Sequence, residues 1–524
     1  MIQSSRLAAF AVFGLVLVLP AGSHADSTGD TGWVSLFDGQ SLAGWKATEN
    51  PASFRVVDGT IACDGPRAHL FYVGADGKAA FDDFEAEVEV KARAGANSGF
   101  YFQTAFQDED WPTQGFEVQV DNSQKRHGDY LELKMTGSLY GIRNVYKALA
   151  KDDEWFTLQV TVRKPRVEIR VDGTLVVDWT EPSGSLPESA PKLNRLGRGT
   201  FALQCHDPES KVFFRNLRVR ALPNAVAPSV TPSTTNTPTA QTPATTAAVP
   251  TAPLVDERYA QILTLGRANF PLVDLHAHLK GGLTLEQVLK LSRETGVFLG
   301  VAANCGKGFP IETDADATKF VESMKGQPVF VAMQAEGREW VTMFSKETRA
   351  KFDYVFTDGM TWTNPAGKRM RLWIPEEVEI GPGTVGGASG DEAREQGFMD
   401  LLVSKIVGIL ETEPIDIYVN PTFLPAVIAG KYDALWTTER MNRVIDAAVK
   451  NGVAIEINAR YELPSEAFLR LAKTKGAKFT FGTNNAGASD LGDWSYPLEM
   501  QRKLDLKWQD MFVPGHSPSR AQRE

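Results

Sequence analysis

The chain has 524 residues, 43% of them hydrophobic and 23% charged, with a formal net charge of −10 at pH 7. Single cores rarely grow past roughly 250 to 300 residues, so this length predicts more than one domain. The charges are spread along the chain, and no stripe of Lys and Arg interleaved with aromatic residues occurs, which argues against nucleic acid as a partner.

The first 25 residues have the pattern of a secretory signal peptide. Arg6 precedes an apolar run at 7–20, and small residues fill most of 21–25. We expect cleavage after Ala25 and a secreted or periplasmic protein. A transmembrane helix needs about 20 apolar residues, and no stretch of the chain reaches that length, so we expect no stable membrane insertion.

From Pro223 to Pro253 the chain consists almost entirely of Pro, Thr, Ala and Ser, without a charged or aromatic residue. Such a segment cannot bury enough apolar surface to offset the entropy of ordering. We therefore predict a linker at 223–254 between a first domain at 31–222 and a second at 256–515. The last residues, 516–524, are predicted to be a disordered tail.

The first domain is predicted to consist of short strands joined by tight turns. Apolar and polar residues alternate at 54–57, 84–91, 156–162, 167–171 and 212–219. Asp58-Gly59 and Asp172-Gly173 lie between runs and are typical of hairpin turns. Many short strands without a long helical segment indicate an all-β sandwich of two sheets.

Three segments of this domain carry aromatic and polar side chains at alternate positions. Alternate residues of a strand share one face. The groups that share a face are Tyr101 with Gln103, then Glu117 with Gln119 and Asp121, then Tyr130 with Glu132 and Lys134. Rings beside hydrogen-bonding groups suit a sugar, although the solvated outer face of an antiparallel sheet has the same alternation.

The three cysteines, Cys63, Cys205 and Cys305, are too few for a disulfide framework. Cys63 and Cys205 both lie in predicted strands of the first domain. They could pair, but two separately buried thiols are the favoured interpretation.

The second domain alternates short apolar strands with amphipathic helices. The predicted strands are 271–277, 298–303, 329–334, 354–357, 415–419, 453–457 and 478–481. Clear helices occur at 285–294, behind a Thr284 cap, and at 439–450. Seven strands in this order predict a parallel sheet covered on both faces, most simply an α/β barrel, in which reactive groups lie where strands end.

Several motifs of the first domain point to one family. They are 33–45, 97–99, 116–122, 136–141, 203–207 and 214–217. In these motifs and their order the domain resembles the 3-keto-disaccharide hydrolase domain family. The resemblance implies a concanavalin-like jelly-roll sandwich, and an activity on glycosides whose glucose unit has been oxidised at carbon 3.

The implied chemistry agrees with the residues present. A ketone at carbon 3 acidifies the proton on carbon 2, so a base can remove it, and the enediolate can then expel the glycosidic oxygen from carbon 1. Addition of water gives net hydrolysis, and the route needs a base, an acid and donors for the enediolate. We predict Glu117, Asp121 and His206 as catalytic residues, with Glu117 as base and His206 as acid.

The residues predicted to bind substrate are Tyr101, Gln103, Gln119, Lys134, Tyr140 and Gln204. A divalent cation held by some of the carboxylates stays open, because a 2-hydroxy-3-ketone is a good bidentate ligand. No organic cofactor is expected. The partner is a carbohydrate, and an oxidoreductase that forms 3-keto sugars would act upstream.

In the second domain, Val273-Asp-Leu-His-Ala-His278 places two imidazoles on one face of a strand, and 334–336, 455–458 and 481–484 follow at later strand ends. On these motifs and the seven strands the domain resembles the polymerase and histidinol phosphatase (PHP) superfamily of metal-dependent phosphoesterases. The resemblance implies a distorted (β/α)7 barrel.

The second domain departs from the PHP pattern in its later histidines. Asn420 stands where that family usually has a His, and Asn484 replaces an acidic residue. Neutral amides are poor metal ligands. We therefore expect at most one divalent ion, held by His276, His278, Glu336 and Asp358.

The leading hypothesis is an exported enzyme that cleaves 3-keto-glucosides or 3-keto-disaccharides, with the sandwich as catalytic unit and the barrel as accessory or degenerate partner. The alternative is a carbohydrate-binding sandwich tethered to a metal-dependent PHP-type phosphoesterase barrel, since fold alone does not decide between binding and catalysis. A structural or surface-attachment protein is the third hypothesis, and the lack of repeats disfavours it.

Overall fold

The computed structural model describes residues 32–184, 194–223, 257–364, 367–380, 391–517 and 519–523. The predicted signal peptide and most of the predicted linker lie outside these ranges. Within them, every helix is too short or too polar to span a bilayer.

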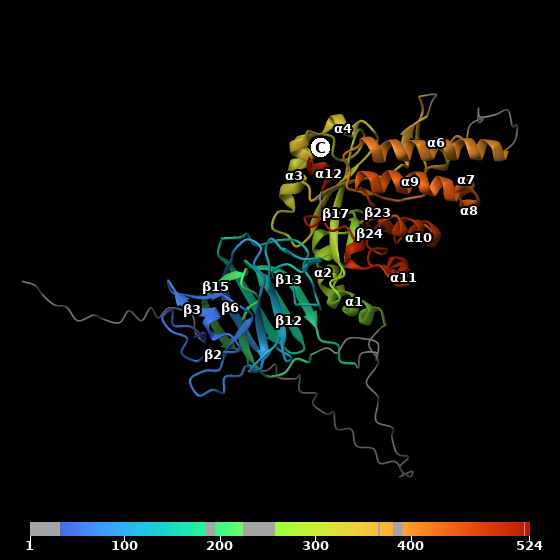
Figure 1. Ribbon diagram of the computed structural model, residues 1–524. Coiled ribbons are helices and arrows are strands. Elements are labelled where there is room, and N and C mark those ends of the chain that lie inside the picture. Colours follow the sequence, from blue (N-terminus) through green and yellow to red (C-terminus); the bar gives the residue numbers. More distant parts are fainter. Residues whose placement is uncertain are drawn as a thin grey trace, which may run out of the picture.

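The first domain is an all-β sandwich of two antiparallel sheets, as the sequence predicts (Figure 1). The larger sheet has the order β13 (Thr174–Thr180), β12 (Arg166–Val171), β11 (Phe156–Arg163), β6 (Phe84–Ala92), β15 (Lys211–Ala221), β4 (Thr60–Asp64) and β3 (Phe54–Val57), with β1 (Val34–Ser35) also paired to β15. The smaller sheet has the order β2 (Trp45–Ala47), β5 (Ala68–Tyr72), β14 (Thr200–Cys205), β7 (Ser98–Thr104) and β8 (Phe116–Val120). A short helix η1 (Pro51–Ser53) and a hairpin of β9 (Arg126–His127) and β10 (Tyr130–Leu131) complete the domain.

Both Asp-Gly turns predicted from sequence close hairpins. Asp58 and Gly59 have positive φ values of 48° and 72°, and they join β3 to β4. Asp172 and Gly173 join β12 to β13 with φ values of 46° and 78°. Asp and Gly tolerate this left-handed conformation, which the twist of a hairpin favours.

The two sheets differ in what covers their outer faces. On the larger sheet, β6 alternates buried and partly exposed residues, and its outward glutamates form ion pairs with arginines of β15, such as Glu87 with Arg218 at 2.8 Å. On the smaller sheet, every residue of β7 and β14 is buried. The outer face of the smaller sheet is therefore covered by other parts of the chain.

The second domain contains the predicted closed barrel of seven parallel strands. In order around the barrel they are β16 (Val273–Ala277), β17 (Phe298–Cys305), β18 (Phe330–Ala335), β19 (Tyr354–Thr357), β22 (Ile417–Tyr418), β23 (Ala454–Asn458) and β24 (Phe479–Gly482). The longer helices are α1 (Glu257–Arg267), α2 (Leu285–Thr295), α3 (Asp314–Ser323), α6 (Asp391–Thr412), α9 (Thr438–Asn451), α10 (Glu466–Thr474) and α11 (Ser495–Leu504). Shorter elements are α4 (Trp340–Met343), α5 (Lys346–Arg349), α7 (Ala426–Ala429), α8 (Tyr432–Leu435), α12 (Arg520–Arg523), η2 (Pro375–Glu377), η3 (Trp508–Asp510) and the hairpin of β20 (Thr361–Thr363) and β21 (Arg369–Arg371).

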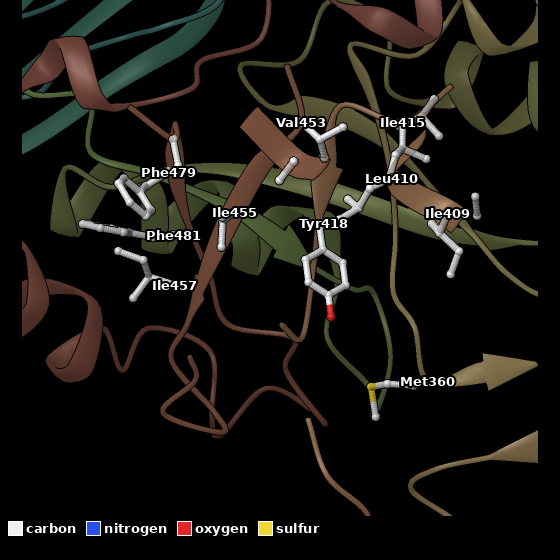
Figure 2. Close-up of a cluster of buried hydrophobic side chains, with 14 of the residues drawn as sticks. Met360, Ile409, Leu410, Ile415, Tyr418, Val453, Ile455, Ile457, Phe479 and Phe481 are labelled. Carbon is white, nitrogen blue, oxygen red and sulfur yellow. The ribbon is translucent and has the colours of Figure 1, made fainter. Parts of the chain in front are cut away.

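Alternation along the barrel strands puts apolar side chains on the outer face, whereas the interior holds polar groups beside rings such as Phe356. Ile455 and Ile457 of β23 belong to the hydrophobic cluster that also contains Phe479 and Phe481 of β24 (Figure 2). Between them, Glu456 is fully buried and bonds to His276 of β16. The helix cap predicted at Thr284 is also confirmed, because Thr284 caps α2 in a capping box with Gln287.

The two domains pack directly on each other, with α2 beside β13 (Figure 1). Tyr146 of the sandwich donates a hydrogen bond to the Phe270 carbonyl of the barrel at 3.2 Å. Lys147 forms an ion pair with Asp353 at 2.7 Å. One continuous hydrophobic cluster includes residues of both domains, so the sandwich and the barrel share part of a core.

Residues 516–517 and 519–523 do not match the disordered tail predicted at 516–524. Arg520 begins α12, and its backbone N–H donates to Asp416 at 2.7 Å. His516 bonds to the Tyr146 carbonyl at 3.1 Å. These partners lie far away in sequence, which is why local composition did not reveal them. The cysteines follow the favoured interpretation, since Cys63, Cys205 and Cys305 are all free and buried.

Candidate active site

The outer face of the smaller sheet holds a cavity of about 480 Å³. This volume lies within the range typical of small-molecule sites. Strands β7, β8 and β14 form its base, and loop residues wall it. Its lining includes the rings of Tyr101, Trp111, Tyr130 and Tyr140, the amides of Asn97, Gln119 and Gln204, the carboxyl groups of Glu117 and Glu132, the imidazole of His206 and the guanidinium of Arg267.

Glu117 lies at the base of this cavity, on β8. Its Oε1 accepts a hydrogen bond from Gln204 Nε2 at 3.0 Å. Burial raises the pKa of Glu117 to about 7, and hydrogen bonds from Tyr101 and Gln204 oppose that rise only in part. A carboxyl group that exchanges its proton near neutral pH is suited to general acid or base catalysis.

The space for this carboxylate comes from a glycine on the neighbouring strand. A Cβ atom added to Gly99 of β7 would lie 2.2 Å from Oε1 of Glu117. Any side chain at Gly99 would therefore displace the carboxylate. This steric need explains the glycine in the Asn97-Ser-Gly99 motif.

Two amides of the cavity are held by other polar side chains. Gln204 also donates to the Tyr101 hydroxyl at 3.0 Å, and its buried Oε1 has no partner among the described residues. Gln119 donates to Oδ1 of Asn97 at 2.9 Å. Such an oriented and incompletely satisfied network is able to bond the hydroxyl groups of a sugar.

His206 follows β14 and lies at the side of the cavity where Trp111 covers it, with ring centroids 5.2 Å apart. Its Nδ1 lies 2.8 Å from Oδ2 of Asp207. The same carboxylate oxygen accepts a hydrogen bond from Ser210 Oγ at 2.8 Å. A carboxylate on Nδ1 orients the imidazole and leaves Nε2 as the nitrogen for proton transfer.

Glu132 is the second carboxyl group of the cavity, and its surroundings differ from those of Glu117. Its Oε2 accepts hydrogen bonds from Tyr130 at 2.8 Å and Tyr140 at 2.9 Å, and its Oε1 accepts one from Lys134 Nζ at 2.8 Å. Burial opposes ionisation, but Lys134 outweighs it and holds the pKa of Glu132 below its usual value. Glu132 is therefore an ionised anchor for two rings, whereas Glu117 is the group that exchanges a proton.

The structure brings most of the sequence-predicted site residues of the sandwich together. Tyr101, Glu117, Gln119, Tyr140, Gln204 and His206 all line the cavity. Lys134 does not, since it is completely buried beneath the Tyr140 ring, with Nζ 4.4 Å from the ring centroid. It acts on the cavity through Glu132.

Asp121 and Gln103 were predicted as site residues, but neither lines the cavity. Asp121 is buried outside the cavity lining, and its Oδ1 accepts from the Gln124 backbone in a turn at 2.8 Å. Gln103 has a φ of 52°, and the pairing of β7 with β14 shifts register beside it. This bulge turns the Gln103 side chain towards the carbonyl groups of Asp82 and Gly197, at 3.0 and 2.7 Å.

Sequence reasoning missed several lining residues as site residues, among them Asn97, Trp111, Tyr130, Glu132 and Arg267. Tyr130 and Glu132 share the predicted polar face, so alternation could have identified them. Trp111 lies in a loop without periodicity. Arg267 belongs to the second domain, and no pattern in the sequence shows that the barrel reaches this cavity.

The metal ligands predicted in the barrel lie at the ends of its strands, but they are bonded to other protein groups. His276 Nδ1 lies 2.6 Å from Glu456 Oε1, and His278 Nδ1 lies 3.1 Å from the Ala302 carbonyl. Glu336 accepts a hydrogen bond from Asn304 at 2.7 Å, and Asp358 accepts one from Asn420 at 3.2 Å. Burial and the nearby Asp358 raise the pKa of Glu336.

These barrel residues do not fit a divalent ion. His276 Nε2 and Gln334 Oε1 are buried without a hydrogen-bond partner among the described residues, which a metal would explain. Within the described ranges, however, no three His, Cys, Asp or Glu side chains converge as metal ligands would. The asparagines already donate to the carboxylates that a metal would need.

Comparison with known proteins supports the resemblance of the first domain. The model of a family described as a 3-keto-alpha-glucoside-1,2-lyase-like domain matches residues 32–220. This match covers the sandwich. A search of curated proteins finds no match.

Several solved structures resemble part of this chain. A candidate glycosyl hydrolase from Parabacteroides distasonis ATCC 8503 is 23% identical over 37% of this chain and 94% of its own, with a TM-score of 0.31. The carbohydrate-binding module CBM66 from Bacillus subtilis is 15% identical over 36% and 96%, with a TM-score of 0.22. Histidinol phosphate phosphatase from Lactococcus lactis subsp. lactis Il1403, complexed with zinc, L-histidinol and phosphate, is 12% identical over 48% and 98%, with a TM-score of 0.33. Similarities this low do not establish an activity.

Proposed function

We propose that the protein is an exported enzyme that cleaves 3-keto-glucosides or 3-keto-disaccharides in the sandwich cavity. The observation that carries this proposal is Glu117, a carboxyl group at the base of a cavity rich in rings and amides, with its pKa raised by burial to about 7. The match of the first domain to a 3-keto-alpha-glucoside-1,2-lyase-like family supports the same substrate class.

In the proposed reaction Glu117 removes the proton from carbon 2, and the C–H electron pair moves toward the carbon 3 carbonyl to form an enediolate. The enediolate then expels the glycosidic oxygen, so the C1–O bond breaks, and His206 protonates the leaving oxygen through Nε2. Addition of water across the C1–C2 double bond puts a hydroxyl on carbon 1 and returns a proton to carbon 2. The net result is hydrolysis, and no oxidant or reductant is consumed.

The surrounding side chains have supporting roles in this proposal. Gln204 and Tyr101 orient the base, and Gln119 and Asn97 bond sugar hydroxyls. Tyr140 and Trp111 offer ring surface to the weakly apolar face of the pyranose, which is a common way to bind sugars with aromatic side chains. The carbon 3 ketone would come from an upstream oxidoreductase that acts on the parent glycoside.

Incubation of the full-length protein with a chromogenic 3-keto-glucoside tests the proposal. Wild type should release the chromophore and 3-keto-glucose, whereas Glu117→Gln and His206→Ala should each lose about 10²- to 10⁴-fold in kcat while they stay folded. Glu154→Gln, which changes an exposed carboxylate of the same domain, is the matched control and should retain activity. Saturable binding by wild type without turnover would support the sugar-binding alternative instead.

A further inference from the structure

The barrel forms part of the wall of the cavity in the sandwich. Arg267, the last residue of α1, lines the same cavity as Glu117 and Glu132. It lies outside residues 32–220, which the family model matches. This contribution to the cavity therefore belongs to the two-domain arrangement of this chain.

A glycine of the sandwich makes room for this side chain. A Cβ atom at Gly141 would lie 2.7 Å from Cγ of Arg267, and the φ of Gly141 is 69°. Gly141 follows Tyr140 directly, so the arginine crosses the backbone next to a ring of the cavity. Both the space and the backbone conformation at this crossing require glycine.

A second barrel residue holds the cavity wall from behind. Asn269 Oδ1 accepts hydrogen bonds from the Leu133 backbone at 3.1 Å and from Lys134 Nζ at 3.2 Å. Its Nδ2 donates to the Leu131 carbonyl at 2.7 Å. Asn269 thus bonds the segment on both sides of Glu132, the anchor of Tyr130 and Tyr140.

The charge balance of the cavity gives Arg267 a chemical purpose. Removal of a proton from carbon 2 puts negative charge on the substrate in a cavity that already contains the ionised Glu132. Lys134 is completely buried beneath Tyr140, so it is not placed to touch a substrate. A guanidinium keeps its positive charge at all working pH values and bonds two oxygens at once.

We propose that the active site is composite, in which the sandwich supplies Glu117 and His206 and the barrel supplies Arg267 as the cation that contacts the oxyanion of the substrate. Asn269 is a positioning residue that acts through Lys134 and Glu132. This inference rests on the proposed function for the identity of the oxyanion, but the composite cavity itself rests on the contacts between the domains. The barrel is then a structural part of the catalytic unit.

Substitution of Arg267 in the full-length chain tests this proposal. Arg267→Gln should lower kcat for the chromogenic 3-keto-glucoside about 10²- to 10³-fold with a smaller change in KM, because the interaction strengthens as charge develops. Arg267→Lys keeps the positive charge but loses the paired N–H donors. Its loss of kcat should therefore be about tenfold smaller than that of Arg267→Gln. Arg502→Gln, at an exposed position of α11, is the matched control for loss of an arginine.

Chemical rescue separates a catalytic role from a structural one. Added guanidinium should restore part of the activity of Arg267→Ala and none of that of Glu117→Gln, whereas a purely structural arginine would not be rescued. Asn269→Ala should lower kcat about tenfold without rescue. Wild-type activity in Arg267→Gln would overturn the proposal.

A binding measurement tests the composite site independently of whether the protein cleaves 3-keto-glucosides. If wild type does not cleave 3-keto-glucosides, the full-length protein and Arg267→Gln are titrated with glucuronate, a sugar that carries a carboxylate. Wild type should bind glucuronate at least tenfold more tightly than the variant. Equal affinity, or no binding by either protein, would refute the composite site as well.

Discussion

Gln204 donates a hydrogen bond of 3.0 Å to Oε1 of Glu117 across the base of the cavity, although 87 residues separate the two in sequence. This donor stabilises the anionic form of the carboxyl group, whereas burial stabilises the neutral form. The balance brings the pKa of Glu117 to about 7. The pairing of β14 with β7 and of β7 with β8 creates this contact.

The first prediction concerns the pH dependence of turnover. A base must be deprotonated, so kcat/KM should rise with pH through about 7, the pKa of Glu117. Gln204→Met removes a donor to the carboxylate and should raise that pKa, which moves the acidic limb to higher pH. The measurement is kcat/KM of both proteins from pH 5 to 9. An acidic limb at the same pH in both would show that Glu117 does not set it.

The second prediction concerns stability. The pKa of Glu117 rises from 4.5 to about 7 in the folded protein, so the folded state binds more protons than the unfolded state between those pH values. This group therefore lowers the free energy of unfolding as pH rises from about 4.5 to 7. Glu117→Gln should match wild type at pH 4 and have the higher Tm at pH 8, where it is inactive. A Tm difference that is the same at both pH values would contradict this sign.

Much of the site could be predicted from strand alternation, because Glu117, Gln119 and Tyr101 lie where a period of two puts them. Gln103 does not follow this alternation. A bulge adds one residue to β7, so the Gln103 side chain points away from the cavity face. Lys134 kept its place on the polar side of the pattern but is buried by Tyr140 and by Asn269 of the other domain.

The seven barrel strands were visible because each is a short apolar run between amphipathic helices. The packing of the two domains could not be predicted from sequence, since it depends on how the surfaces of the two folded domains fit together. The positions of Arg267 and α12 depend on contacts with segments far away in sequence, so no local sequence pattern predicts them. The sequence predicted metal ligands at the carboxyl ends of the barrel strands, but it does not show that amides pair with the carboxylates there.

The third prediction concerns Asp121, which the sequence placed among the catalytic residues. Burial raises the pKa of Asp121 to about 8, so its side chain is mostly neutral at pH 7. An asparagine has nearly the same shape and can accept the same bond from the Gln124 backbone. Asp121→Asn should therefore keep kcat within about twofold. Its free energy of unfolding should match that of wild type near pH 4 and exceed it at pH 7, because Asp121 of the unfolded wild type loses its proton from about pH 3.8 upward.

Glu117→Gln is the matched comparison, because it also neutralises a buried carboxyl group of the same strand region. Both variants should gain stability relative to wild type as pH rises from about 4 to 8, since both remove a group whose pKa is raised in the folded state. Only Glu117→Gln should be inactive. A loss of 100-fold or more in Asp121→Asn, with the fold intact by circular dichroism, would return Asp121 to the catalytic set.

The fourth prediction concerns metal removal. His276 bonds to Glu456 and Asp358 to Asn420, so the polar groups of the barrel stabilise one another without a cation. A ligand that binds only the folded state raises Tm, and its removal lowers Tm. Dialysis of the full-length protein against a strong chelator should therefore leave both Tm and turnover unchanged. Elemental analysis should find less than about 0.1 divalent ion per chain, since tight protein metal sites are filled at stoichiometry. A stoichiometric ion, with a lower Tm after chelation, would show that the strand ends rearrange around a metal, and His276→Ala should then abolish its binding.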